Sequence, residues 1–263
     1  MIGVLSPEVT YPKAKEATTK ALQLDENLGE AHAVLAVMRF RYDRDWIGAE
    51  NEFKRALALN PSFAATHIWY SHYLLPSGRE EESFAESKRA LELDPFNLII
   101  NTHLGWNYLY ARQYDKAIEQ LRKTLELDPN FAIAHLFLGQ AYEKKAMYGQ
   151  AIVEFQNAVN SASGAVHLAA LGHGYAMSGD KVAAQRILDE LKSLSRRRYV
   201  PSYELAVVCI GLGDKEQALV WLQRAYDQRD SGWLVDASVD PRFEPLHSDP
   251  RFQDLLRRMG SPP

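Results

Sequence analysis

The chain has 263 residues, of which 46% are hydrophobic and 24% are charged, and this composition excludes an intrinsically disordered protein. The 30 Lys and Arg residues against 34 Asp and Glu residues give a net charge of -4, so the chain has no general attraction for nucleic acid or an anionic membrane. No apolar run reaches the ~18 residues of a membrane span. The single cysteine, Cys209, cannot form an internal disulfide, and this favours a reducing, cytoplasmic location.

Apolar periodicity and helix-boundary residues predict an all-α chain. The predicted helices run roughly over residues 8–23, 27–42, 46–59, 62–75, 79–93, 96–110, 114–127, 130–145, 148–161, 164–178, 181–195, 199–212 and 215–228. We interpret residues 1–25 as a half repeat that supplies only a second helix, and residues 26–230 as six helical hairpins. Because its first half is missing, we expect the chain to be a piece of a longer polypeptide, with possible self-association through this truncated N-terminal end.

The hairpins repeat one sequence unit. A capping residue followed by Pro recurs 34 residues apart, as Asn60-Pro61, Asp94-Pro95 and Asp128-Pro129. A Leu-Gly pair followed by Tyr recurs inside the helices, as Leu104-Gly105 with Tyr108, Leu138-Gly139 with Tyr142 and Leu171-Gly172 with Tyr175. Because Gly inside a helix costs about 1 kcal/mol relative to Ala, these glycines predict a close approach of the second helix of each hairpin.

These offsets resemble the tetratricopeptide repeat family, whose unit of about 34 residues carries a Leu-Gly, Tyr, Ala, Phe and Pro signature. The resemblance covers nearly the whole chain, and it implies an all-α solenoid of helical hairpins wound into a right-handed superhelix. We expect an extended, curved shape. The sequence departs from the family pattern where the usual Trp of the first helix is replaced by His32, His67, Asn101 and His135.

Residues 231–263 break the repeat. Asp240-Pro241-Arg242-Phe243 and Asp249-Pro250-Arg251-Phe252 lie nine residues apart, and in each copy Asp suits the N-cap and Pro the first helical position. The second copy begins an amphipathic helix, which is predicted to cap the open end of the solenoid. A nucleic-acid role for the two Arg-Phe pairs is disfavoured by the acidic residues beside them.

The sequence predicts no catalytic residue, no cofactor site and no metal site. It contains no His-Glu-x-x-His motif, no paired Cys and no phosphate-binding loop. His32, His67 and His135 share one place between the two helices of a hairpin and are expected to serve packing. His72 and His173 share a different place, which favours a role in ligand contact.

A second apolar face on the first helices predicts a concave groove. On helix 96–110, Trp106 lies about 160 degrees from Leu104 and Gly105, so packing inside the hairpin should not need it, and Trp106→Ala should cost within roughly 1 kcal/mol. First helices line the inner surface of a stacked array, so this face should bind a protein or peptide segment. The predicted groove residues are Phe40, Ile68, Trp69, His72, Thr102, Trp106, Tyr110, Leu136, Phe137, Gln140, His173 and Tyr203.

The leading functional hypothesis is therefore a protein-interaction scaffold rather than an enzyme. The alternative is a regulatory or sensor module of a larger bacterial transcription regulator, kinase or cyclase, because Trp233 and the two Asp-Pro-Arg-Phe copies resemble the closing segment of such arrays. A third possibility is that the apolar stripe packs against itself through tight superhelical curvature. Binding of acidic C-terminal tails is disfavoured, because apolar residues or His stand where the Asn and Lys of that clamp occur in the family.

Overall fold

The computed structural model describes residues 6–230 and 232–260, and every regular element in these residues is helical, which confirms the predicted all-α fold. The α-helices are α1 (Pro7–Leu24), α2 (Gly29–Met38), α3 (Trp46–Leu59), α4 (Ala64–Leu74), α5 (Glu80–Leu93), α6 (Leu98–Tyr110), α7 (Tyr114–Leu127), α8 (Ala132–Lys144), α9 (Tyr148–Ser161), α10 (Ala165–Met177), α11 (Lys181–Leu194), α12 (Ser202–Leu212), α13 (Lys215–Asp227) and α14 (Pro250–Arg258). A π-helical turn, η1 (Arg39–Asp43), extends α2, and two 3-10 helices, η2 (Gly232–Asp236) and η3 (Pro241–Leu246), follow α13.

Consecutive helices from α2 to α13 pack as antiparallel pairs, and the Leu-Gly positions lie where the two helices of a pair are closest. A Cβ atom on Gly105 would lie 2.6 Å from Leu121 Cγ, and one on Gly139 would lie 2.6 Å from Phe155 Cδ1. A methyl group at either position would therefore push the second helix away. The close approach predicted from these glycines is confirmed.

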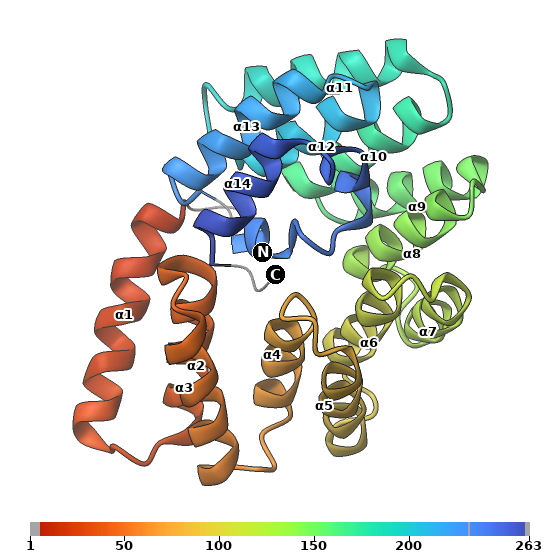
Figure 1. Ribbon diagram of the computed structural model, residues 1–263. Coiled ribbons are helices and arrows are strands. Elements are labelled where there is room, and N and C mark those ends of the chain that lie inside the picture. The colour runs from red at the N-terminus through yellow and green to blue at the C-terminus, as the bar shows by residue number, and fades with distance from the viewer. Residues whose placement is uncertain (1–5, 231, 261–263) are drawn as a thin grey trace.

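The array curls into a ring, so that α13 and α14 come round to the first helices (Figure 1). Trp46 Nε1, at the start of α3, donates a hydrogen bond of 2.8 Å to the carbonyl of Met259. Arg44 Nη2 donates to the carbonyl of Tyr226 at 2.8 Å, and the guanidinium lies 3.9 Å from the centre of the Tyr226 ring. The predicted extended shape is therefore wrong, because contacts between the first and last hairpins close the curve.

A segment between α13 and α14 occupies the inside of this ring (Figure 1). We call residues 232–246, which form η2, η3 and their connection, the inner segment. Phe243 and Leu246 of the inner segment are fully buried, and η3 packs against α12. As predicted, α14 lies against α13 at the end of the array, with Phe252 buried. No sequence pattern predicts, however, that the inner segment runs through the concave side.

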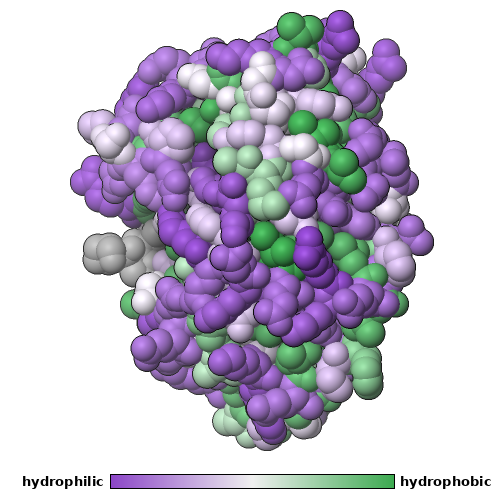
Figure 2. Space-filling model, turned by 90° about the vertical axis from the view of Figure 1, so that its right-hand side faces the viewer, coloured by the Kyte–Doolittle hydropathy of each residue, from purple (hydrophilic) through white to green (hydrophobic). Residues whose placement is uncertain are grey.

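The face of the molecule in Figure 2 is predominantly polar. On the face shown in Figure 2, hydrophilic residues cover most of the area and apolar residues form small patches. At the N-terminal end, α1 buries only Thr18 among its residues, while Val9 and Leu24 are 44% and 82% exposed. Self-association through this end stays a prediction. Among the described helices, none is long and apolar enough to cross a membrane.

A histidine ties together the two helices of three hairpins, in the packing position predicted for it. Nδ1 lies within 2.6 Å of a glutamate on the second helix, in the pairs His32 and Glu52, His67 and Glu86, and His135 and Glu154. Nε2 of the same ring faces a backbone carbonyl six residues earlier, in Glu26, Pro61 or Pro129. In the hairpin of α6 and α7, Asn101 and Gln120 make the equivalent contact with side-chain amides.

The partners of His67 and His135 favour the imidazolium and raise the pKa of both rings, because a carboxylate and a carbonyl both accept hydrogen bonds. The hydrogen bond to Glu154 raises the pKa of His135 against the opposing effect of burial. A raised folded-state pKa stabilises the fold below the unfolded value of about 6.5, and the contribution is lost as the pH rises through the folded value.

We expect the double variant His135→Asn, Glu154→Gln, which copies the amide pair of α6 and α7, to remove this dependence on pH. The parent chain should lose stability relative to the variant as the pH rises above about 6.5. Urea denaturation of both proteins over a pH series measures the difference. If the free energy of unfolding changes with pH in the same way in parent and variant, the contact of His135 with Glu154 does not contribute to the pH dependence of stability.

Candidate functional site

The candidate site is the concave groove, which we define as the inner surface formed by α2, α4, α6, α8, α10 and α12. Every predicted groove residue lies on these helices or on η1, and all except the half-buried Trp69 are no more than 5% exposed. The inner segment crosses this surface, so that the chain fills its own groove. Among the predicted groove residues, Tyr110 and Tyr203 make hydrogen bonds to the inner segment in this structure.

The predicted residues divide into two groups. Phe40 packs edge-on against Trp46 and Tyr73, Ile68 belongs to an apolar cluster with Ala90, and Trp69 faces Phe63. This first group joins neighbouring hairpins. The second group lies at the inner segment or next to residues that contact it, and it includes His72, Trp106, Tyr110, His173 and Tyr203.

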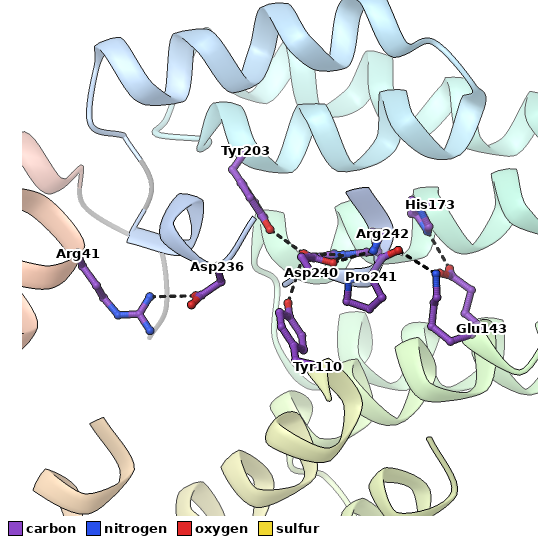
Figure 3. Close-up of polar contacts among 10 residues, drawn as sticks. Arg41, Tyr110, Glu143, His173, Tyr203, Asp236, Asp240, Pro241 and Arg242 are labelled. Carbon is purple, nitrogen blue, oxygen red and sulfur yellow. Dashed lines mark hydrogen bonds and ion pairs between the residues drawn. The ribbon is translucent and has the colours of Figure 1, made fainter. Parts of the chain in front are cut away.

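Asp240 is the central anchor of the inner segment (Figure 3). Tyr203 on α12 donates its hydroxyl to Asp240 Oδ2 at 2.6 Å, and Tyr110 on α6 donates to the same oxygen at 3.3 Å. The guanidinium of Arg242 donates to both carboxylate oxygens, at 3.0 Å and 2.6 Å. Burial opposes ionisation of Asp240, but these contacts outweigh it and hold the pKa of the carboxyl below its usual value. The groove thus binds a buried carboxylate.

Arg41 holds the other end of the inner segment. Its Nη1 donates to Asp236 Oδ2 at 3.3 Å, as Figure 3 shows. The same Nη1 donates to the carbonyl of Gly232 at 2.8 Å, and the guanidinium lies 5.0 Å from the centre of the Trp233 ring. Burial raises the pKa of Asp236 to about 6, despite the nearby guanidinium. Arg41 belongs to η1, so this contact connects the first hairpin to residues about 190 positions later.

Neutral histidines lie behind Arg41. Nδ1 of His72 is 3.1 Å from Arg41 Nη2, and Nε2 of His72 makes a hydrogen bond with His103 Nδ1. Burial, together with the charge of Arg41, lowers the pKa of His103 to about 3, and burial also lowers that of His72. His72 can therefore accept a hydrogen bond from Arg41. Its ring also stacks on Trp106, with centroids 4.2 Å apart.

Trp106 is fully buried between His72 and Tyr110. Its ring contacts are made with His72 of the preceding hairpin and with Tyr110 of its own helix, so neighbouring parts of this chain surround it and its removal is expected to cost stability. The helical periodicity correctly turned it away from the Leu-Gly face, but curvature brings other parts of the chain over it. Thr102 and Gln140 are buried in the same way.

The far end of the inner segment is held by α8 and its neighbours. Lys144 Nζ donates to the carbonyl of Pro241 at 2.8 Å, and Arg112 makes an ion pair of 2.9 Å with Glu244. Beside them, Nδ1 of His173 lies 2.9 Å from Glu143. A cavity of 220 Å³ opens here between α8, α10 and η3, so solvent reaches the groove next to Pro241.

Sequence reasoning missed the polar anchors. Arg41 and Lys144 are absent from the predicted groove residues. An isolated basic residue at a helix end does not indicate a partner that lies about 100 or more positions away in the sequence. Asp240 and Arg242 were noticed as a repeated motif but were interpreted as part of a cap. Within residues 6–230 and 232–260, no three His, Cys, Asp or Glu side chains gather as metal ligands would.

One segment of the chain is similar to a known family. Residues 107–145, which span α7 and α8, match the family model of the TPR repeat. No curated protein sequence matches the chain.

Solved structures share its fold at low sequence identity. The APC/C hetero-tetramer Cut9-Hcn1 aligns with a TM-score of 0.62 and 18% identity over 94% of this chain and 45% of the other. PilW, a type IV pilus biogenesis factor, aligns with a TM-score of 0.58 and 16% identity over 87% of this chain and 98% of the other. A human IFIT1 dimer with PPP-AAAA aligns with a TM-score of 0.63 and 18% identity over 95% of this chain and 64% of the other.

The chain thus spans less than half of the Cut9-Hcn1 chain that it matches. The helical pairs on both sides of residues 107–145 continue the arrangement of the segment that matches the TPR repeat model. Residues 107–145 are thus similar to the TPR repeat, and the chain as a whole shares the fold of the solved structures with which it aligns.

Proposed function

We propose that this chain is a protein-interaction scaffold whose concave groove binds a polypeptide segment. The observation that carries the proposal is the inner segment, which is itself such a segment and is held by side chains from α6, α8, α12 and η1. Hydroxyl, ammonium and guanidinium donors face its carboxylates and carbonyls, and an aromatic surface covers its Phe243. This combination of apolar contact and a few directed hydrogen bonds is typical of peptide recognition.

A groove that is filled in cis favours regulated binding. A partner competes with the inner segment for the same surface, so its apparent affinity falls by the fraction of molecules in which the groove is closed. A change that weakens the hold on the inner segment, at a residue that the partner itself does not contact, then increases binding. This feature supports the regulatory module that the sequence suggests as an alternative. A scaffold and a regulatory module would both use a closed form, with the inner segment in the groove, and an open form, with the inner segment displaced.

The test compares two arginines of η1 in the full chain. Arg41→Ala removes the donor to the inner segment, whereas Arg39→Ala removes a half-exposed arginine that pairs with Asp45 at the outer edge. Selection from a random peptide library on immobilised protein should enrich peptides on Arg41→Ala and not on Arg39→Ala or the parent. Adding Tyr203→Phe should reduce that enrichment. If folded Arg41→Ala enriches no peptide, the proposal is overturned.

A further inference from the structure

The two Asp-Pro-Arg-Phe copies fold locally in the same way. In the first, Asp240 Oδ1 accepts hydrogen bonds from the backbone N of Arg242 at 2.9 Å and from its Nε at 3.0 Å. In the second, Asp249 Oδ1 accepts from the backbone N of Arg251 at 2.9 Å and from its Nε at 3.1 Å. The Asp-Arg pair is buried in the first copy, whereas Arg251 of the second copy is exposed, so the shape comes from the four residues themselves.

This local folding makes the motif a pre-organised ligand. The Asp carboxylate is already turned toward its own Arg, which neutralises much of the charge before the pair leaves water. Fewer side-chain rotations are lost on binding than for an unstructured peptide. Any protein segment that carries the same four residues should therefore present the same shape.

The groove supplies partners for Asp240, Pro241 and Phe243 of the first copy, while Arg242 pairs with Asp240 of the same motif. The hydroxyl groups of Tyr110 and Tyr203 donate to Asp240, and Lys144 donates to the carbonyl of Pro241. Phe243 meets the Tyr203 ring edge-on at 5.3 Å and is fully buried. The second copy has no such surroundings: Arg251 is half exposed and makes a surface ion pair of 2.7 Å with Glu216.

The closed form also leaves polar atoms without a protein partner. Glu204 Oε2 on α12, Asp236 Oδ1 and Arg242 Nη1 are buried, and within the described residues none of these atoms has a hydrogen-bond partner. Burial raises the pKa of Glu204 to about 7. Unpaired buried polar atoms cost free energy and reduce the hold on the inner segment. The cavity beside Pro241 is the place where a competing segment would first reach the groove.

We infer that the groove is a recognition site for the Asp-Pro-Arg-Phe sequence, and that its ligand in trans is a segment of a partner protein that carries this sequence and displaces η3. The inference rests on the proposed function and adds to it the chemistry of the ligand. The groove reads the carboxylate through two tyrosine hydroxyls, the Pro carbonyl through Lys144, and the Phe ring through Tyr203.

The test uses a fluorescent synthetic peptide with the sequence of residues 237–248 and full-length Arg41→Ala protein. A control peptide carries Asn in place of Asp240 and Ala in place of Phe243. Fluorescence anisotropy should show binding at least about tenfold tighter for the parent peptide, because a charged acceptor and a buried aromatic anchor are both lost from the control.

Protein variants then locate the site. Tyr110→Phe with Tyr203→Phe should weaken peptide binding about tenfold or more, because both hydroxyl donors to the carboxylate are lost. Tyr142→Phe is the matched control, since its hydroxyl contacts Arg122 away from the groove, and it should leave binding unchanged. A second measurement uses the unsubstituted protein in place of Arg41→Ala. An excess of the parent peptide should speed amide hydrogen exchange at residues 241–246 of this protein more than the control peptide does.

Three outcomes overturn the inference. If Arg41→Ala selects unrelated peptides but binds parent and control peptides equally, the proposed function stands and the Asp-Pro-Arg-Phe specificity fails. If neither kind of peptide binds and exchange at residues 241–246 is unaffected, both fail. If sedimentation shows a dimer that the parent peptide dissociates, the ligand is a second copy of this chain and not a separate partner.

Discussion

Replacing Asp240 by Asn is expected to lower the free energy of unfolding by about 3–5 kcal/mol, whereas the same replacement at Asp249 should cost about 1 kcal/mol or less. Both residues cap a helix, and both bind the Arg two positions later. They differ in surroundings: Asp240 is fully buried, and its partner Arg242 is 8% exposed. Removing the carboxylate therefore leaves a buried guanidinium without its counter-charge. At Asp249 the remaining Arg251 is still solvated, and Asn is as good an N-cap as Asp.

Urea denaturation of the two variants measures the contrast, because the residue change and the local motif are identical. The Asp240 effect should also shrink in acid. The folded pKa of Asp240 lies below its unfolded value of about 3.9, so its stabilising contribution is present above that value and is lost as the pH falls through the folded pKa. Equal losses of stability in the two variants at neutral pH would show that the inner segment is not held by the buried ion pair.

Replacing Trp106 by Ala should cost about 3–5 kcal/mol, as much as Leu104→Ala, for which 2–5 kcal/mol is typical. Trp106 is fully buried and stacks on His72 and Tyr110, with ring centroids 4.2 Å and 4.4 Å away. Its removal leaves a large cavity between α4, α6 and the residues that hold the inner segment. This expectation reverses the one drawn from the sequence, in which Trp106 faced an open groove.

The half-buried Trp69 provides the control, because it lies at the edge of the same predicted stripe and lines a surface cavity. Trp69→Ala should cost clearly less than Trp106→Ala in chemical denaturation. A loss within about 1 kcal/mol for Trp106→Ala would mean that the inner segment leaves the groove readily and that the ring is solvated in the dominant form in solution.

These predictions connect stability with binding. If the inner segment is held as tightly as the buried Asp240 and Arg242 suggest, then variants that loosen it should lose stability and gain affinity for peptides in trans. Arg41→Ala is designed to loosen one end while the central anchor at Asp240 remains. A scaffold of this type can be switched by any process that competes for Arg41 or for the carboxylate of Asp236.

The sequence by itself determined the local structure of this protein. The 34-residue spacing of capping residues and prolines, and the Leu-Gly pairs, specified the helices and their pairing, because helix boundaries and the close approach at Gly105 and Gly139 depend on nearby residues. The histidine ties were likewise readable as packing positions from their repeated place. The concave face was located correctly on the first helices, since helical periodicity decides which side chains point inward.

Only the tertiary structure decided what covers that face. Curvature is the sum of small rotations between neighbouring hairpins, and no single motif encodes that sum. It brings Trp46 to Met259, and Arg41 to Asp236, across nearly the whole length of the chain. The Asp-Pro-Arg-Phe copies are identical in sequence, yet Arg242 of the first is buried in the groove and Arg251 of the second is exposed. Long-range contacts of isolated charged residues determine that difference, and they leave no periodic trace in the sequence.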